Sequence, residues 1–231
     1  MPGKTPSQLS QPLGRRERRS VETREKLFRA ALRLFSERGF VATTVEDITE
    51  AADVGKGTFF NYFPSKEHIL AQLGEIQVAK MTVLVEAAPG SPKPIRQQLH
   101  ELTQALSEEP GRSQAMFRNM LIANLSNQAV RTLMEGYMEA ARRKLAELMK
   151  LGQSRGELRR DLSAMDLAAT FQRSFFGTLM MWSVHPPSSL QEWFDTTFSV
   201  LWSGIQCGSP RRCRGQRAAT TRERRQGGVE V

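Results

Sequence analysis

The sequence predicts an all-α protein, in which a small N-terminal helical unit precedes a larger helical unit. Two observations lead to this prediction. Apolar residues recur at helical spacing along most of the chain, and no segment shows the alternating pattern of a β-strand. Helix-breaking pairs of proline and glycine residues, such as Pro110–Gly111 and Pro186–Pro187, separate the helical segments. With 39% apolar residues, the 231-residue chain can form a packed core.

The first predicted helix follows a basic and flexible N-terminal arm. Residues 1–19 contain prolines, glycines and polar residues without helical periodicity. Apolar residues then share one helical stripe, and Gly39 ends the helix as expected of a residue beyond the C-cap. The stripe consists of Leu27, Ala30, Ala31, Leu34 and Phe35.

Two short helices joined by a tight turn come next. Thr44 is expected to be the N-cap of the second helix, and Asp47, three residues later, completes a capping box. After the turn, Gly55 is an acceptable N-cap for a third helix, Lys56–Phe63, which the following proline ends. Two short helices around a turn form a helix-turn-helix motif, so the N-terminal unit is predicted to be a three-helix domain of that type.

The rest of the chain continues as helices. A fourth helix, about 66–86, is capped by Ser65 and is followed by a loop rich in proline and glycine at 87–94. The last two predicted segments are strongly apolar and aromatic. The helices expected after the loop span about 95–108, 112–125, 127–154, 164–183 and 188–206.

The net charge of +9 is concentrated at the two ends of the chain. Residues 1–20 carry five basic residues and one acidic residue, and residues 208–231 carry seven arginines and two glutamates. The segment between them is neutral. Basic arms attract phosphate or anionic surfaces without reading a base sequence, and the simpler interpretation is that they are disordered, solubilising tails.

Several classes of protein are disfavoured by what the sequence lacks. No apolar run approaches the length of a membrane span, and the N-terminus lacks the apolar region of a secretory signal. Cys207 and Cys213 make no disulfide framework, so reduced thiols in the cytoplasm are expected, although a bond between the two is conceivable. The histidines His68, His100 and His185 are scattered, and there is no nucleophile motif or phosphate-binding glycine loop. We expect no catalysis, no metal and no cofactor.

The third predicted helix carries chemistry that suits double-stranded DNA. Phe59 and Phe63 lie four residues apart and are expected in the core, and the opposite face has no acidic residue before Glu67. A short helix that exposes donors and aromatic residues fits the major groove, where an amide pairs with adenine and a lysine with guanine or phosphate. An alternative stays open for the aromatic residue at position 60, which could pack on the fourth helix. The candidate DNA-contacting residues are Lys56, Gly57, Thr58, Phe60, Asn61 and Tyr62.

The segment from Thr23 to Leu70, TREKLFRAALRLFSERGFVATTVEDITEAADVGKGTFFNYFPSKEHIL, resembles the tetracycline-repressor-type (TetR/AcrR) family of bacterial regulators. The resemblance implies a homodimer. Each subunit would pair a three-helix DNA-binding domain with a larger C-terminal helical domain that holds a small-molecule pocket and the dimer interface. It also implies phosphate contacts from Thr44, Tyr62 and Lys66, although Thr44 is already explained as a structural cap.

The sequence departs from the family pattern at three positions. Asp53 stands where the family usually has glycine, and Gly55 stands where it usually has serine. Aspartate tolerates turns and glycine is a fair N-cap, so the fold should persist, but a hydroxyl that could contact phosphate is lost. Phe60 stands where many members have tyrosine, which removes a second hydroxyl.

The resemblance also implies a ligand pocket in the C-terminal helices. Methionines and aromatic residues with a few polar groups suit an apolar, aromatic or cationic aromatic ligand. Taken one by one, these residues are better explained as ordinary core, so the pocket follows from the resemblance alone. The candidate pocket residues are Met116, Phe117, Met120, Asn124, Tyr137, Phe171, Gln172 and Phe175.

The last two predicted helices are more apolar than a monomer surface would allow. A two-fold, four-helix interface would cover this excess, and burial within the subunit is the alternative. The candidate interface residues are Trp182, Trp193, Phe194, Phe198 and Trp202.

The sequence therefore predicts a DNA-binding transcriptional regulator, most simply a dimeric repressor that a small ligand releases from a pseudo-palindromic operator. An activator or a regulator without a ligand stays open. A protein of another class, a nonspecific binder of nucleic acid or anionic surfaces, would depend on its basic arms. The predicted segments are a flexible basic arm (1–19), a helix-turn-helix DNA-binding domain (20–66), a helical regulatory and dimerisation domain (67–207) and a disordered Arg-rich tail (208–231).

Overall fold

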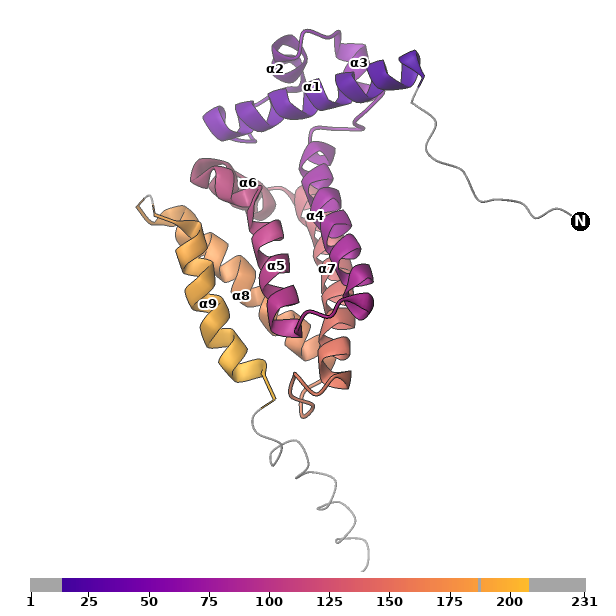
Figure 1. Cartoon of the computed structure of the whole chain (residues 1–231). Coiled ribbons are helices and arrows are strands. Elements are labelled where there is room, and N and C mark those ends of the chain that lie inside the picture. The colour runs from indigo at the N-terminus through magenta and orange to yellow at the C-terminus, as the bar shows by residue number, and fades with distance from the viewer. Residues whose placement is uncertain (1–13, 187, 208–231) are drawn as a thin grey trace, which may run out of the picture. The chain divides into compact units, whose positions relative to one another are not determined.

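The computed structural model describes residues 14–186 and 188–207, and within these ranges the protein is built from helices (Figure 1). The described residues form nine α-helices and two single-turn 3-10 helices, and they contain no β-strand, only an isolated bridge between Leu158 and Gln206. The prediction of an all-α protein is confirmed. The chain divides into two compact units, residues 1–69 and 70–231.

The first helix begins earlier than the sequence analysis expects. Helix α1 is Arg15–Arg38, so the end of the predicted flexible arm is helical. The cause lies at Gly14, whose backbone N–H donates to the carboxylate of Glu17 at 2.9 Å and so satisfies one end of the helix. The rest of the arm, residues 1–13, and the Arg-rich tail at 208–231 lie outside the described residues.

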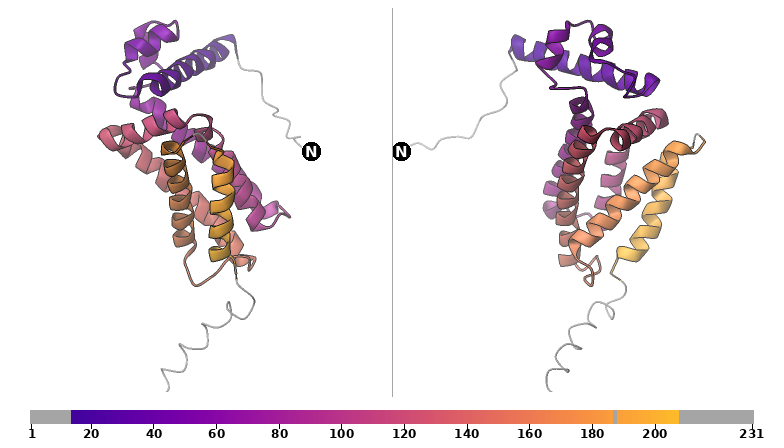
Figure 2. Two further views of the ribbon diagram at one scale, coloured as in Figure 1. Left: turned by 90° about the vertical axis from the view of Figure 1, so that its left-hand side faces the viewer. Right: turned by 180° about the vertical axis from the view of Figure 1, so that it is seen from behind.

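The first unit is a three-helix domain with an aromatic core. Helix α2 is Val45–Ala51 and helix α3 is Lys56–Phe60, and Figure 2 shows both on the same side of α1. The predicted stripe of the first helix and the aromatic pair Phe59 and Phe63 are all buried. The largest fully buried side chains of the unit are Phe35, Phe59, Phe63, Leu27, Ile48 and Ile69.

Helix α3 is shorter than the predicted helix Lys56–Phe63 and ends at Phe60. Beyond this residue the backbone bonds tighten, and the N–H of Tyr62 donates to the carbonyl of Phe59 at 3.0 Å. Pro64 explains the early end because it has no N–H to donate to the carbonyl of Phe60, four residues before it, so the helical bonds cannot continue. The last residues of the predicted helix therefore lie on a turn.

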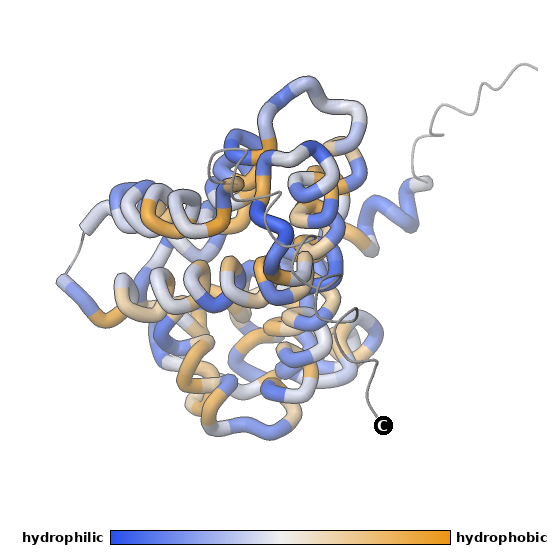
Figure 3. The backbone as a smooth tube through the Cα atoms, turned by 90° about the horizontal axis from the view of Figure 1, so that it is seen from below, coloured by the Kyte–Doolittle hydropathy of each residue, from blue (hydrophilic) through white to orange (hydrophobic). Residues whose placement is uncertain are grey.

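The second unit is a bundle of helices in which α8 contacts α6, α7 and α9. Helix α4 begins in the first unit and continues into the second. Figure 3 shows hydrophilic and hydrophobic residues alternating along the helices, as expected where each helix buries one face. None of the described helices combines the length and the apolar character needed to cross a bilayer. The elements are α4 (Glu67–Ala87), η1 (Ala88–Gly90), α5 (Ile95–Ser107), η2 (Pro110–Arg112), α6 (Gln114–Ser126), α7 (Gln128–Ser154), α8 (Ala164–Val184) and α9 (Leu190–Ile205).

Two apolar clusters hold this bundle together. The larger one is built from α4, α5, α7, α8 and α9 and includes Leu99 and Met149, which are fully buried. The smaller one joins α6, α8 and α9 and contains Phe117, Leu179 and Phe194. Helix α8 contributes to both clusters, so a displacement of α8 would disturb the whole unit.

Cys207 follows α9 at the end of the described residues. It is disulfide-bonded, so the expectation of a reduced thiol is wrong at this residue. Oxidation depends on the redox surroundings and on local geometry, and the spacing of cysteines specifies neither. Cys213 lies outside the described residues.

Candidate nucleic-acid interface

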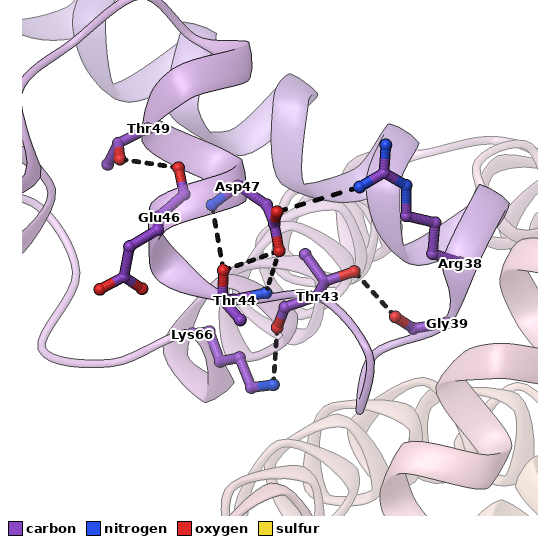
Figure 4. A network of polar contacts seen from close by, with 8 residues as sticks. All are labelled: Arg38, Gly39, Thr43, Thr44, Glu46, Asp47, Thr49 and Lys66. Atoms are coloured by element: carbon purple, nitrogen blue, oxygen red, sulfur yellow. Dashed lines mark hydrogen bonds and ion pairs between the residues drawn. The ribbon is translucent and has the colours of Figure 1, made fainter.

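The start of α2 is fixed by a complete capping box (Figure 4). The hydroxyl oxygen of Thr44 accepts from the N–H of Asp47 at 3.1 Å, and the N–H of Thr44 donates to the Asp47 carboxylate at 2.8 Å. The Thr44 hydroxyl also donates to the same carboxylate at 2.7 Å. This hydrogen bond, followed by the one from the Thr44 backbone, lowers the pKa of Asp47. The side chain of Thr44 is thus engaged inside the protein, while the residue is exposed.

The turn between α2 and α3 needs an unusual backbone conformation. Asp53 has φ 55°, and it is the sole non-glycine residue with positive φ among the residues described. The N–H of the next residue, Val54, donates to the carbonyl of Thr49 at 3.0 Å and closes the turn. Glycine tolerates a positive φ best, which explains the glycine that the family usually has at this position. Aspartate tolerates a positive φ better than most residues, so Asp53 can replace that glycine.

Helix α3 has a buried side and an exposed side, as the sequence analysis predicts. Phe59 is 0% exposed and Phe63 is 1% exposed. On the other side Phe60 is 52% exposed, so this ring is not buried against the fourth helix. We call the exposed set the α3 face; it comprises Lys56, Gly57, Thr58 and Phe60 on the helix and Asn61 and Tyr62 on the turn after it, of which Thr58 and Tyr62 are half-buried and the others exposed.

Lys56 forms an ion pair with Glu46 of α2 across the turn. The hydrogen bond from Lys56 lowers the pKa of Glu46. Both side chains are more than half exposed, and exposed pairs of this kind add little to stability. The ammonium of Lys56 can therefore exchange this carboxylate for a phosphate or a base edge at small cost.

The ammonium of Lys66 bonds to backbone carbonyls and not to residues of the α3 face. Its ammonium donates to the carbonyls of Phe40 at 2.9 Å and Thr43 at 2.8 Å, in the connection between α1 and α2. A lysine just before a helix N-terminus interacts unfavourably with the helix dipole. Its position in the sequence therefore indicates that Lys66 has a partner other than the helix. The carbonyls themselves, 23 and 26 residues away, carry no such signal.

The candidate pocket residues do not gather at one place. Phe117 belongs to the smaller cluster and Phe171 to the larger. Gln172 is buried between α7 and α8, where it accepts from Arg142 at 3.1 Å and donates to the carbonyl of Met138 at 2.8 Å. Both of its functional groups are thus satisfied within the protein.

Three further pocket candidates lie half-buried on α6: Met116, Met120 and Asn124. The side-chain oxygen of Asn124 is buried without a hydrogen-bond partner among the described residues. Tyr137 packs instead on Gly74 of α4, where an added Cβ would come within 2.6 Å of its ring. Its hydroxyl donates to Glu75 at 2.9 Å, and burial, followed by this carboxylate, raises the pKa of the phenol.

One small cavity lies between α5, α8 and α9. It is nearly filled by its own side chains, and its free volume of about 10 Å³ has room for about one water molecule. Phe171 and Phe175 from the candidate pocket line it together with Phe194 and Phe198, which the sequence analysis assigned to the dimer interface. The full lining consists of Thr103, Phe171, Ser174, Phe175, Phe194, Thr197, Phe198 and Leu201.

The large aromatic residues of α8 and α9 turn inward. Trp182, Phe194 and Phe198 are buried within the subunit at 5%, 3% and 6% exposure, and Trp193 and Trp202 are half-buried. These three buried side chains therefore cannot form a dimer interface. They pack within the subunit, which is the alternative left open by the sequence. A second apolar stripe of these helices, outside the predicted interface, is exposed: Phe176, Met180, Met181 and Val184 on α8 and Val200 on α9.

The fold and the α3 face define a helix-turn-helix protein with a separate helical bundle. Residues 27–73 match the family described as "Bacterial regulatory proteins, tetR family". The chain is 31% identical over 159 residues to the transcriptional repressor DhaR of Mycobacterium sp. (strain GP1), covering 64% of this chain and 75% of that protein. It is 41% identical over 95 residues to the transcriptional regulator TcmR of Streptomyces glaucescens, covering 40% of this chain and 42% of TcmR.

A solved structure agrees with these sequence matches. The TetR-family repressor FadR of Thermus thermophilus, in complex with lauroyl-CoA, shares 31% identity and a TM-score of 0.60, over 78% of this chain and 94% of FadR. The chain belongs to the TetR family of bacterial transcriptional regulators, a class of DNA-binding proteins and not of enzymes. The chain spans less than half the length of the curated relative TcmR, namely 42%.

Proposed function

We propose that this protein is a homodimeric transcriptional repressor that places α3 of each subunit in the major groove of a pseudo-palindromic operator. The observation that carries the proposal is the α3 face. Donor and aromatic side chains stand exposed or half-buried on a short helix and the turn after it, and Phe59 and Phe63 anchor this segment in the core. From Lys56 to Lys66 the chain has no acidic residue that would repel phosphate.

Specific binding needs two copies of this unit. A single short helix contacts few base pairs, and a two-fold dimer doubles the contacts and fixes their spacing. The exposed stripe on α8 supports such a dimer because Phe176, Met180 and Val184 recur every four residues and are 37%, 47% and 60% exposed. This stripe, with Val200 on α9, replaces the buried aromatic residues as the proposed interface.

A small apolar or aromatic effector is proposed to control operator binding. The cavity between α5, α8 and α9 is lined mainly by phenylalanine rings, and a molecule that enlarged it would move the helices of the proposed interface. FadR of Thermus thermophilus has been solved with lauroyl-CoA, an acyl compound with a long apolar chain. By analogy, the effector of this protein has an apolar portion.

Helix α4 is the proposed connection between effector and DNA. It begins at Glu67 in the unit that carries the α3 face and ends at Ala87 in the helical bundle. Tyr137 of α7 packs on Gly74 and bonds to Glu75, so a shift of α7 would act on α4 directly. A coupling free energy of about 1–3 kcal/mol, typical of allosteric proteins, changes operator occupancy by about 5- to 150-fold.

Fluorescence anisotropy with genomic DNA fragments tests this function. Full-length protein should bind a small subset of fragments tightly at about 0.15 M salt, where nonspecific binding is weak. Equal binding of all fragments would show a nonspecific binder that acts through its basic arms, and an absence of binding would reject DNA as the target. A regulator of this kind acts on chromosomal DNA, which in a bacterium means the cytoplasm.

A further inference from the structure

Helix α1 extends well beyond the core that it helps to form. The helix begins at Arg15, but its first buried residue is Leu27, and every residue from 14 to 22 is exposed. The guanidinium of Arg24 lies 5.6 Å from the centre of the ring of Phe63, just after α3. From this contact back to Arg15 the helix rises by about 14 Å, at 1.5 Å per residue, so its start overhangs the three-helix domain.

This overhanging start of α1 is strongly basic. The helix opens with the residues RRERR, and the carboxylate of Glu17 among them is bonded to the backbone N–H of Gly14. Within the part of the chain that the structure describes, no acidic side chain forms an ion pair with Arg15, Arg16 or Arg19. We call these three arginines the α1 cluster.

The α1 cluster lies near α3. Arg16 precedes the buried Leu27 by about three helical turns, so both residues are on the face of α1 that meets the core. Arg19 is three residues after Arg16 and four after Arg15, so the three side chains are neighbours on the helix. Figure 1 shows α3 nearer than α2 to the start of α1, in agreement with the contact between Arg24 and the segment after α3.

The position of these charges is unfavourable in the protein by itself. A helix N-terminus carries a partial positive charge, so arginines in the first turns oppose the helix dipole. Like charges at spacings of three and four residues also repel one another. A bound anion would remove both effects, and the guanidinium group is well suited to phosphate because it donates two parallel N–H bonds.

We propose that the α1 cluster is a second DNA-contacting element, which binds backbone phosphates near the base pairs that α3 reads. The inference rests on the proposed binding of DNA by the α3 face, and it adds a surface that touches no base. Charge complementarity selects this partner, because duplex DNA carries one negative charge per about 1.7 Å of its axis. An overhang of about 14 Å corresponds to about four base pairs, so the cluster reaches phosphates outside the contact of α3 itself.

The salt dependence of operator binding tests the α1 cluster. Each phosphate contact adds about 0.9 to the steepness of log K against log salt. The triple variant Arg15→Gln, Arg16→Gln, Arg19→Gln should bind the selected operator more weakly, with a slope shallower by about 5, because three contacts are lost in each of two subunits. A slope shallower by about 0.9 or less would overturn the proposal.

The base preference of the same variant gives a second measurement. Phosphate contacts carry no sequence information, so the ratio of affinities for the operator and for an operator with one substituted half-site should equal that of the wild type. A reduced ratio would show that the arginines read bases, which contradicts the proposal.

A matched control removes the same charge from another part of the chain. Arg96 on α5 and Arg143 and Lys150 on α7 are exposed. The variant Arg96→Gln, Arg143→Gln, Lys150→Gln should keep the wild-type slope. An equal loss of slope in both triple variants would show that net charge, and not the α1 cluster, is responsible.

Measurements without DNA separate a binding role of the cluster from a structural one. The triple variant of the α1 cluster should keep or raise the wild-type Tm, because the deleted cations oppose the helix dipole. A lower Tm with a wild-type salt slope would assign the arginines to helix stability and refute the proposal. A wild-type slope together with lost binding to phosphatidylserine vesicles would assign them to an anionic membrane surface instead. Failure of the proposed function would already appear in the wild-type protein, as an absence of selective binding, whereas failure of this inference appears only in the variant.

Discussion

Replacing Gly57 with alanine should stabilise the protein and weaken its binding to DNA. Gly57 is exposed in α3, and a Cβ added there would meet no atom within 4 Å. The residue is not among the described glycines with positive φ, so alanine fits the backbone without strain. A glycine-to-alanine change in a helix stabilises by about 0.5–1 kcal/mol, which raises Tm by about 1–4 °C in a chain of this size.

The affinity of Gly57→Ala for the operator should fall although its stability rises, because Gly57 belongs to the α3 face. A methyl group there would push the helix away from the groove floor and disrupt a base contact worth about 1–3 kcal/mol, which corresponds to a loss of about 5- to 150-fold in affinity. Thermal melting by circular dichroism and anisotropy of a labelled operator measure the two effects. Higher Tm with unchanged affinity would refute a close approach of α3 to DNA at this point.

Gly136 of α7 provides a matched control for this experiment. It is also exposed and helical, and a Cβ added there also meets no atom within 4 Å. The variant Gly136→Ala should raise Tm by a similar amount and leave operator affinity unchanged. A loss of affinity in both variants would indicate that helix stiffening, and not contact with DNA, is responsible.

Three further predictions concern different parts of the chain. The double variant Asn61→Ala, Tyr62→Phe should lose specific DNA binding and keep its helicity, because the deleted groups lie on exposed or half-buried positions of the α3 face; unchanged operator affinity in anisotropy would show that this face is misassigned. Asp47→Asn should be less stable than wild type at neutral pH, and the difference in Tm should close as pH falls well below 4. The hydrogen bond from Thr44 lowers the pKa of Asp47 in the folded protein. The carboxylate therefore stabilises the fold above its unfolded pKa, and this stabilisation is lost as pH falls through its folded pKa. A gap that does not change with pH would contradict this cause. Met180→Glu should yield monomers in analytical ultracentrifugation, because Met180 is 47% exposed on the proposed interface; an intact dimer would place the interface elsewhere.

The first unit could be predicted well from the sequence because its signals are local. The capping box of Thr44 and Asp47 joins residues three apart, and the burial of Phe59 and Phe63 follows from a spacing of four. The predicted end of α3 is too late because Pro64 leaves the carbonyl of Phe60 without a backbone donor four residues on.

The site in the second unit could not be predicted because it depends on contacts between distant segments. Helices α8 and α9 are apolar on more than one side, and the sequence does not say which side meets α5, α6 and α7. The core takes up the rings of Trp182 and Phe198, while Phe176 on the same helix as Trp182 stays exposed, so side-chain size alone does not identify the buried face. The partners of Lys66 were hidden for the same reason, because they are backbone carbonyls far along the chain.

Selection of bound sequences from a random DNA library by the full-length protein tests the central claim most directly. The α3 face, presented twice by a symmetric dimer, should enrich an inverted repeat whose half-sites lie about one helical turn, or a multiple of it, apart. Enrichment of a single half-site without symmetry would contradict the proposed dimer. A pool without any enriched sequence would contradict the assignment of α3 as the helix that reads DNA.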